Sequence, residues 1–187
     1  KNINFQNIEI KKRLIKYNKI SKNKFDRIII SPGIDLNKCK LSKYLKKNLS
    51  RVNTDLDIFY YFCPLNKNIT ITGTNGKSTT VKIIYNLLKD QKFDVRLVGN
   101  IGNPILLEKN ITKKTFFVIE ASSYQLEYSK LFKADFSAIL NISPDHLERH
   151  GKLKDYIKAK FKLVRNQRKK GVAFLNTKNP YINKEKR

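Results

Sequence analysis

Two patterns of apolar residues alternate along the chain. Short runs rich in isoleucine, valine and phenylalanine predict buried strands of a parallel sheet. Stretches with an apolar residue at every third or fourth position predict amphipathic helices. The predicted strands cover residues 25–30, 69–72, 94–98, 115–120, 136–142 and 172–176, and the predicted helices cover residues 37–48, 78–90 and 153–165. From residue 68 onward, the order of these elements indicates an α/β unit on a mainly parallel sheet.

A linker signal divides the chain into two parts. Residues 63–66 (CPLN) have the composition of a connecting segment. We therefore expect one part at residues 1–64, within which the apolar and aromatic stretch 54–62 has no assigned element. The second part would be residues 65–187, and its lysine-rich tail from residue 178 is expected to be frayed.

The charge of the chain allows two interpretations. Its 187 residues include 40 Lys and Arg but only 15 Asp and Glu, which gives a formal net charge of +25. Such an excess is typical of proteins that bind nucleic acid. However, 32 of the 40 basic residues are lysines spread over the whole chain, whereas surfaces that read phosphates and bases use arginine heavily. We therefore favour a bias of composition and expect no nucleic-acid partner.

Three further features bound the class of protein. No apolar run approaches the roughly 20 residues that span a bilayer, so we expect no insertion into a membrane. The two cysteines, Cys39 and Cys63, form neither a zinc pattern nor a disulfide framework, which is typical of the cytoplasm. The chain starts at Lys1 and contains no methionine, so we expect a fragment or a trimmed form of a longer protein.

The strongest local signal is the segment GTNGKST between a predicted strand and a predicted helix. Glycines in such a loop let backbone N–H groups turn toward phosphate oxygens, and the start of the helix adds a favourable dipole. Lys77 would bring a positive charge to the β- and γ-phosphates, and the Ser78 hydroxyl is suited to Mg²⁺. The loop is a shortened variant, because Ile71 stands where the usual pattern has its first glycine. The candidate nucleotide-binding residues are Gly73, Thr74, Asn75, Gly76, Lys77, Ser78 and Thr79.

Two more candidate groups follow predicted strands. Glu120 ends an apolar strand, and the carboxyl ends of parallel strands line the ligand crevice of an open α/β sheet. Its carboxylate is suited to a hard cation. The two histidines, His146 and His150, follow the next strand beside Asp145 and Glu148. This set favours a metal or substrate site, but it lacks the four closely spaced ligands of a zinc site.

Lys160 is a candidate because of its position on the predicted helix 153–165. Composition alone would make it one solvated charge in a lysine-rich helix. Its spacing from Tyr156, Ile157 and Val164 nevertheless puts it on the apolar face. An uncompensated ammonium on an inward face would be costly.

Seven segments of the chain, in this order, resemble the Mur ligases of peptidoglycan synthesis. They are SPGI at 31–34, DLDIF at 55–59, the loop at 73–79, GNIG at 99–102, EASSYQLE at 120–127, NISPDHLERH at 141–150 and YIKAK at 156–160. Three residues depart from the family pattern, since Thr54 replaces glycine, Tyr124 replaces phenylalanine and Glu148 replaces aspartate. The SSYQLE stretch is most similar to the members of the family that add D-glutamate.

The resemblance implies a fold that is only partly contained in this chain. Residues 1–64 would be the end of a Rossmann-like, UDP-substrate-binding N-terminal domain with its linker. Residues 65–187 would be the first part of a central ATPase domain of the P-loop type, and the C-terminal domain would be absent.

The resemblance also implies roles for the candidate residues. Lys77, His146 and Lys160 would be catalytic, and Lys160 would be carbamylated. One Mg²⁺ would be bound by Ser78 and Glu120 and a second by His146 and Lys160, while Asp145 and Arg149 would support these ligands. The expected substrate-binding residues are Ser31, Gly33, Asn100, Ser122 and His146.

The activity implied is an ATP-dependent ligation that joins D-glutamate to UDP-N-acetylmuramoyl-L-alanine through an acyl phosphate. We expect these small molecules as partners, a monomer, and a fragment that is inactive alone. Another Mur-type ligase or a folylpolyglutamate synthase is the alternative enzyme. A basic nucleic-acid-binding P-loop protein is the alternative from another class, and it predicts binding that falls steeply with salt.

Overall fold

The computed structural model describes residues 15–20 and 24–186, which divide into two compact units. Residues up to 28 and 34–52 belong to the first, which contains α2 (Tyr17–Ile20), α3 (Ser42–Lys47) and the 3-10 turn η1 (Leu49–Arg51). Two short strands, β1 (Ile28–Ile29) and β2 (Val52–Asn53), pair where the chain passes from one unit to the other. The strand and helix expected here are therefore present but shorter than predicted.

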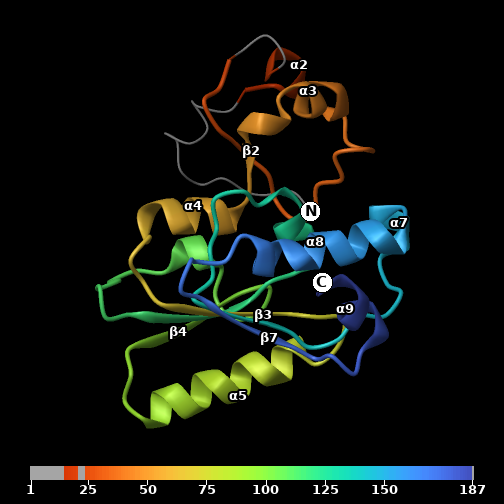
Figure 1. The fold of residues 1–187 in the computed structure, drawn as a ribbon. Coiled ribbons are helices and arrows are strands. Elements are labelled where there is room, and N and C mark those ends of the chain that lie inside the picture. Colours follow the sequence, from red (N-terminus) through yellow and green to blue (C-terminus); the bar gives the residue numbers. More distant parts are fainter. Residues whose placement is uncertain (1–14, 21–23, 187) are drawn as a thin grey trace. The chain divides into compact units, whose positions relative to one another are not determined.

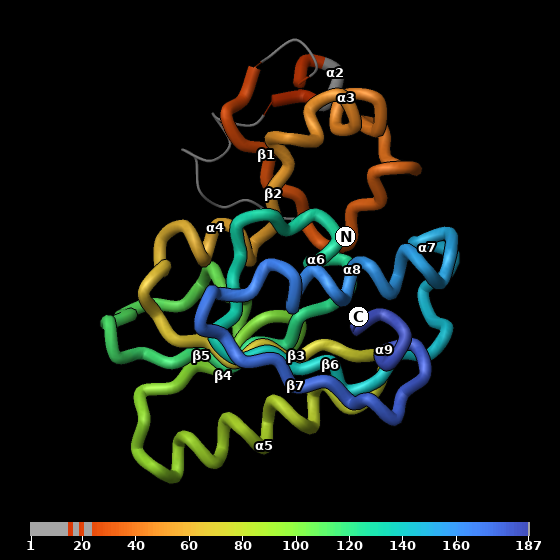
Figure 2. The backbone as a smooth tube through the Cα atoms, in the orientation of Figure 1, coloured from red at the N-terminus to blue at the C-terminus, as the bar shows by residue number. Residues whose placement is uncertain are grey.

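The second unit is built on a five-stranded sheet in which every neighbouring pair is parallel. Its strands are β3 (Asn68–Thr72), β4 (Val95–Gly99), β5 (Phe116–Glu120), β6 (Phe136–Ile139) and β7 (Val172–Leu175). They lie in the order β4-β5-β3-β6-β7, so β3 is central and its two neighbours come later in the sequence (Figure 2). This sheet confirms the predicted α/β fold class.

Helices cover both faces of the sheet (Figure 1). The long helix α5 (Lys77–Asp90) lies on one face, where Val81 is buried and Ile84, Tyr85 and Leu88 pack around it. On the opposite face lie α4 (Asp55–Phe62), α6 (Ser123–Tyr128) and α8 (Leu153–Arg165). The remaining elements are the turn η2 (Ile105–Leu107), α7 (Leu147–His150) and α9 (Pro180–Glu185).

Helix α4 occupies the stretch that had no predicted element, and it packs in the second unit. Leu56 and Phe59 are buried in the same core cluster as residues of β5. Asp57 accepts a hydrogen bond from the Ser129 hydroxyl at 2.7 Å and three more from the backbone N–H groups of 130–132. Burial alone would raise the pKa of Asp57, but these bonds outweigh it and lower the pKa. The second compact unit therefore includes α4, and it comprises residues 29–33 and the residues from 53 onward. The assignment of residues 1–64 and 65–187 to two domains stays a prediction.

The expectation of a frayed tail is wrong. Residues 180–185 form α9, whose N-cap Asn179 accepts a hydrogen bond from the backbone N–H of Ile182. Pro180 stands at the start of the helix, where its missing N–H is no loss. The Ile182 side chain is fully buried in a cluster with Tyr156 and Ile142, and this apolar anchor offsets the surrounding lysines.

Gly99, the last residue of β4, is a position where glycine is required. Its φ of +108° is disfavoured for other residues, and an added Cβ would lie 2.3 Å from the Glu120 carbonyl oxygen. We expect Gly99→Ala to lower the free energy of unfolding by roughly 2–4 kcal/mol, as measured by urea denaturation. Gly33→Ala is the control, because nothing lies within 4 Å of the Cβ added there. Equal stability of the two variants would contradict this account of Gly99.

Candidate functional site

The candidate residues meet at the carboxyl edge of the central strands. The strand order changes direction at β3, which pairs with β5 on one side and β6 on the other. Loops that leave such a switch point diverge and open a crevice for a ligand. The phosphate-loop candidate leaves β3, Glu120 ends β5, and the histidine segment follows β6.

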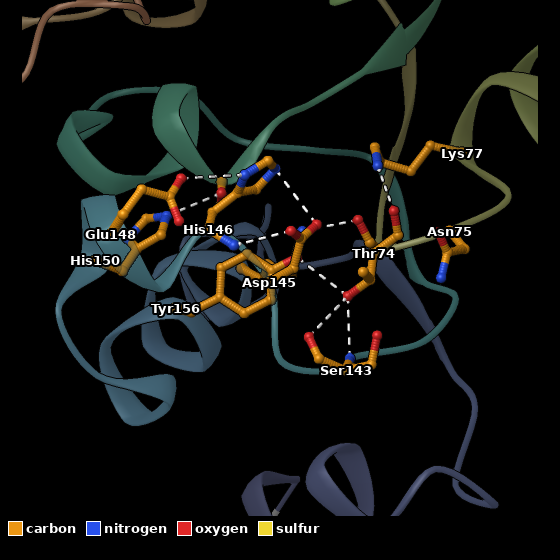
Figure 3. Close-up of polar contacts among 12 residues, drawn as sticks. Thr74, Asn75, Lys77, Ser143, Asp145, His146, Glu148, His150 and Tyr156 are labelled. Atoms are coloured by element: carbon orange, nitrogen blue, oxygen red, sulfur yellow. Dashed lines mark hydrogen bonds and ion pairs between the residues drawn. The ribbon is translucent and has the colours of Figure 1, made fainter.

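The loop after β3 leads directly into α5, as the motif predicted. Gly76 is the N-cap of α5 and has a left-handed backbone (φ +81°). The Asn141 side chain clamps the loop, since its Oδ1 accepts from the Asn75 N–H at 2.8 Å and its Nδ2 donates to the Asn75 carbonyl at 3.0 Å. The Lys77 ammonium folds back and donates to the carbonyl of Thr74 at 2.8 Å (Figure 3). The loop is therefore fixed at the start of α5, where the helix dipole favours an anion.

Glu120 is the most buried acid of the site, with 1% of its surface exposed. Its carboxylate accepts hydrogen bonds from the Ser78 hydroxyl at 2.7 Å and from the Asn100 amide at 2.8 Å. In the part of the chain that the structure describes, no basic nitrogen lies within 4 Å of this carboxylate. A buried negative charge next to a hydroxyl, without a cationic partner, fits a hard divalent cation.

A pocket of about 250 Å³ lies over this edge. Six predicted site residues line it, namely Gly73, Lys77, Asn100, Ser122, His146 and Lys160. Three further residues line it as well, namely Ser123, Tyr124 and Tyr156. Thr79 is exposed on α5 and does not line the pocket. Ser31 and Gly33 lie in an exposed turn and do not line it either, so their substrate contacts stay a prediction.

Lys160 faces the pocket from α8, as the helical spacing predicted, and only 2% of it is exposed. Its Nζ donates to the Gly73 carbonyl at 2.8 Å and lies 4.5 Å from the centre of the Tyr156 ring. Burial, and next the positive charge of Lys77, lower the pKa of Lys160 to about 7, although Asp145 opposes them. The Lys160 amine therefore loses its proton more readily than an ordinary lysine does.

The two histidines have different surroundings. His146 has a left-handed backbone (φ +53°) and an exposed ring that lies 3.4 Å from Asp145 and 3.8 Å from Glu148 (Figure 3). His150 is buried between the rings of Tyr124 and Tyr156. Among residues 15–20 and 24–186, no three His, Cys, Asp or Glu side chains are grouped closely enough to hold a metal ion. The two-ion arrangement thus stays a prediction.

Comparison with known proteins places the second unit in a family. The profile of the Mur ligase middle domain matches residues 71–187. The chain belongs to the Mur ligase family. The nucleotide-loop motif, the strand-end acid and the histidine segment of this Mur ligase chain all lie inside the matched region.

Curated relatives agree with this assignment. A UDP-N-acetylmuramoylalanine--D-glutamate ligase of Caldicellulosiruptor bescii is 40% identical over 153 residues, which are 81% of this chain and 33% of that protein. The protein of the same name from Rickettsia bellii is 36% identical over 95% of this chain and 39% of its own length. This Mur ligase chain therefore spans about a third of the length of the relatives it matches.

Solved structures show the same fold at lower identity. A Neisseria ligase that joins UDP-N-acetylmuramate to a tripeptide matches 85% of this chain and 54% of its own, with a TM-score of 0.58 and 16% identity. A MurF ligase from Thermotoga maritima, solved in complex with ADP, matches 86% and 48%, with a TM-score of 0.55 and 16% identity. Within the described residues of this Mur ligase, no helix is long and apolar enough to cross a bilayer.

Several residues without a predicted role shape the site of this Mur ligase. Tyr156 is fully buried, and its hydroxyl lies 3.1 Å from that of Thr74, which in turn accepts from the Ser143 N–H at 3.0 Å. Together with the Asn141 clamp, these bonds tie the phosphate loop to β6 and α8. The signals in the sequence were the position of Asn141 and Ser143 after a predicted strand and the resemblance of segments 141–150 and 156–160 to Mur ligases.

Because His150 is buried, we expect this Mur ligase to lose stability in acid. The Nε2 atom of His150 lies 3.0 Å from the Ser123 hydroxyl, and burial, followed by the charge of Arg149, lowers its pKa to about 4. Between about pH 6.5 and 4 the unfolded chain binds more protons at this residue than the folded one, so stability falls as pH falls through this window. We expect the wild type to lose roughly 1–2 kcal/mol more than His150→Gln between pH 7 and 5.

Urea denaturation at the two pH values measures this difference. His146→Gln is the matched control, because it removes an exposed histidine of the same short helix region. If the acid sensitivity of His150→Gln equalled that of the wild type, the buried imidazole would not be its source.

Proposed function

We propose that this chain is the phosphate-binding and acyl-binding part of an ATP-dependent ligase that joins D-glutamate to UDP-N-acetylmuramoyl-L-alanine. The observation that carries the proposal is the single pocket shared by the P-loop lysine, the loop after β4 and the buried lysine of α8. Relatives named UDP-N-acetylmuramoylalanine--D-glutamate ligase, which match most of this chain at 36–40% identity, support the choice of substrates.

In the first step, the carboxylate of the alanyl group attacks the γ-phosphorus of ATP. A P–O bond forms to the acyl oxygen, the bond to the β-phosphate oxygen breaks, and ADP leaves. The backbone N–H groups of the loop and the Lys77 ammonium bind the β- and γ-phosphates and lower the charge that opposes this attack. Asn100 and Ser122 orient the muramoyl-alanine part, so the reacting atoms start close together.

In the second step, the amine of D-glutamate attacks the carbonyl carbon of the acyl phosphate. The amide C–N bond forms, the amine loses a proton, and inorganic phosphate leaves with the electrons of the C–O bond. His146, exposed at the mouth of the pocket, contacts the acyl substrate during this exchange.

Mur ligases use ATP and Mg²⁺, and the donor atoms here fit such an ion. When bound, Mg²⁺ supplies Lewis-acid stabilisation to the phosphate oxygens. Ser78 and Glu120 would hold one ion, and His146 with a modified Lys160 would hold a second. The buried, cation-free carboxylate of Glu120 is the observation that supports the first of these sites.

Lys160 would take part as a carbamate. Its neutral amine attacks the carbon of CO₂, an N–C bond forms, and the nitrogen gives up one proton to water. The product is an anion, which removes the cost of burying an ammonium beside Lys77 and provides oxygen atoms as cation ligands. The lowered pKa of Lys160 supports this step, because only the unprotonated amine reacts.

The test is the amino-acid and acceptor dependence of ADP release by the complete ligase. ADP formation that requires both UDP-N-acetylmuramoyl-L-alanine and D-glutamate supports the proposal. Dependence on L-glutamate with a folate acceptor would instead indicate a folylpolyglutamate synthase, and another amino acid would indicate another Mur-type ligase. We propose that the enzyme acts as a monomer in the cytoplasm, which sedimentation and cell fractionation would test.

A further inference from the structure

Two carboxylates of the first turn of α4 hold the two ends of α6. Asp57 accepts four hydrogen bonds from the segment that follows α6, including the one from Ser129. Asp55 acts at the other end, where its Oδ2 accepts a hydrogen bond from the Gln125 side-chain amide at 2.9 Å. Helix α6 begins directly after Ser122, a residue of the pocket. The start of α4 is thus connected to the pocket through a single glutamine.

Gln125 makes three more hydrogen bonds, and all three are with Ser122. Its Oε1 accepts from the Ser122 backbone N–H at 3.0 Å and from the Ser122 hydroxyl at 3.1 Å. The Ser122 hydroxyl in turn accepts from the Gln125 backbone N–H at 3.2 Å. With its proton given to Gln125, this hydroxyl has only a lone pair left for the pocket. It can therefore accept a hydrogen bond from a ligand but has no proton to donate to one.

Whether the Ser122 hydroxyl accepts or donates a hydrogen bond toward the pocket depends on which way the Gln125 carboxamide points. A glutamine amide can turn over and exchange its oxygen and nitrogen, and the reversed form would place NH₂ against the Ser122 N–H, donor against donor. A carboxylate only accepts hydrogen bonds, so Asp55 binds the NH₂ end and leaves Oε1 for Ser122. Gln125 is almost fully buried, with 2% exposed, so water does not offer it an alternative partner.

One oxygen atom of Asp55 is placed unfavourably for the stability of the fold. Its Oδ1 is buried and has no hydrogen-bond partner in the part of the chain that the structure describes. Burial raises the pKa of Asp55, and hydrogen bonds from the Gln125 side chain and from the backbone of Leu56 and of Asp55 itself oppose this effect, while Asp57 adds a smaller rise. A carboxylate with one unpaired buried oxygen lowers stability. The unpaired Oδ1 works against folding, whereas Oδ2 holds the Gln125 carboxamide.

We propose that Asp55 is a positioning residue, which fixes the Gln125 carboxamide so that Ser122 presents a hydrogen-bond acceptor to an N–H or O–H group of the acyl substrate. The identity of that substrate rests on the proposed function. The orientation of Ser122 does not, since it follows from contacts within the chain. A muramoyl-alanine group carries both hydroxyl and amide N–H donors, and a phosphate or carboxylate group would not be bound by an acceptor.

The experiment compares Asp55→Ala with Asp55→Asn, which keeps an acceptor oxygen for Gln125. In this 187-residue chain, hydrogen exchange of the Ser122 amide, followed by NMR, reports the Gln125–Ser122 bond. We expect exchange to quicken at least tenfold in Asp55→Ala and to stay within threefold of the wild type in Asp55→Asn. Asp90→Ala, which removes an exposed carboxylate of α5, should leave it unchanged.

The same variants of the complete ligase separate positioning from structure. We expect Asp55→Ala to raise the KM for UDP-N-acetylmuramoyl-L-alanine about tenfold, with kcat and the KM for ATP within twofold of the wild type, and Asp55→Asn to recover most of the loss. Unchanged Ser122 exchange in Asp55→Ala would overturn the proposal, and so would equal rises in both KM values. If the wild type does not ligate these substrates, the proposed function fails, while the exchange measurement still decides the role of Asp55.

Discussion

Replacing Lys77 by alanine is expected to reduce ATP-dependent ligation by the complete enzyme by roughly 10³-fold or more. Lys77 stands at the first turn of α5, and its ammonium lies in the pocket, where it donates to the Thr74 carbonyl. This cation can leave that carbonyl for the β- and γ-phosphates without rearranging the backbone. Alanine keeps the helix but removes the charge that offsets the developing negative charge at phosphorus.

The measurement is steady-state ADP release together with nucleotide affinity by calorimetry. Lys82→Ala is the matched control, because Lys82 is exposed on the same helix and carries the same charge. Lys77→Ala has a second expected effect, since the positive charge of Lys77 helps to lower the pKa of Lys160. NMR titration should find the pKa of Lys160 closer to its ordinary value in the variant. Near-normal turnover in Lys77→Ala would remove the lysine from the mechanism.

The sheet and its two long helices could be predicted from the sequence because their patterns are long. The apolar face of α5 repeats over four turns, and each strand is a compact β-branched run. The helices that escaped prediction are short and lack such repeats. Helix α6 is only six residues long, and its signal was the capping box formed by Ser122 and Gln125. Helix α9 carried an N-cap asparagine followed by proline, which the excess of lysine obscured.

Site residues could be predicted from the sequence where a charged or metal-binding side chain follows the end of a predicted strand. Lys77, Glu120 and His146 were found in this way, because parallel strands bring their carboxyl ends to one edge. The contacts that tune the site could not be found, since they depend on which strands and helices become neighbours. Asp55 and Gln125 are 70 residues apart in the sequence, and no local pattern indicates that their side chains meet.

Substitutions of the buried Lys160 distinguish a loss of activity from a loss of folding. Lys160→Ala is expected to abolish ligation, and added short carboxylic acids are expected to restore part of it by bringing carboxylate oxygens to the vacated space. Lys158→Ala is the control, because Lys158 is exposed on the same helix. Wild-type activity should also rise with bicarbonate and fall below about pH 7, where protonation of Lys160 removes the amine that reacts with CO₂.

Removing the Lys160 amine is expected to raise the stability of the chain, although it abolishes ligation. The pKa of Lys160 is lowered from 10.5 to about 7 in the folded chain, so between these pH values the unfolded chain binds more protons and the wild type gains stability as pH rises. Lys160→Met fills similar space without an amine. We therefore expect it to be more stable than the unmodified wild-type chain at pH 7, by roughly 1–3 kcal/mol, and to lose this pH dependence between 7 and 10.5. A variant that is better folded yet inactive cannot have lost activity through unfolding, whereas full activity in Lys160→Ala would exclude the carbamate.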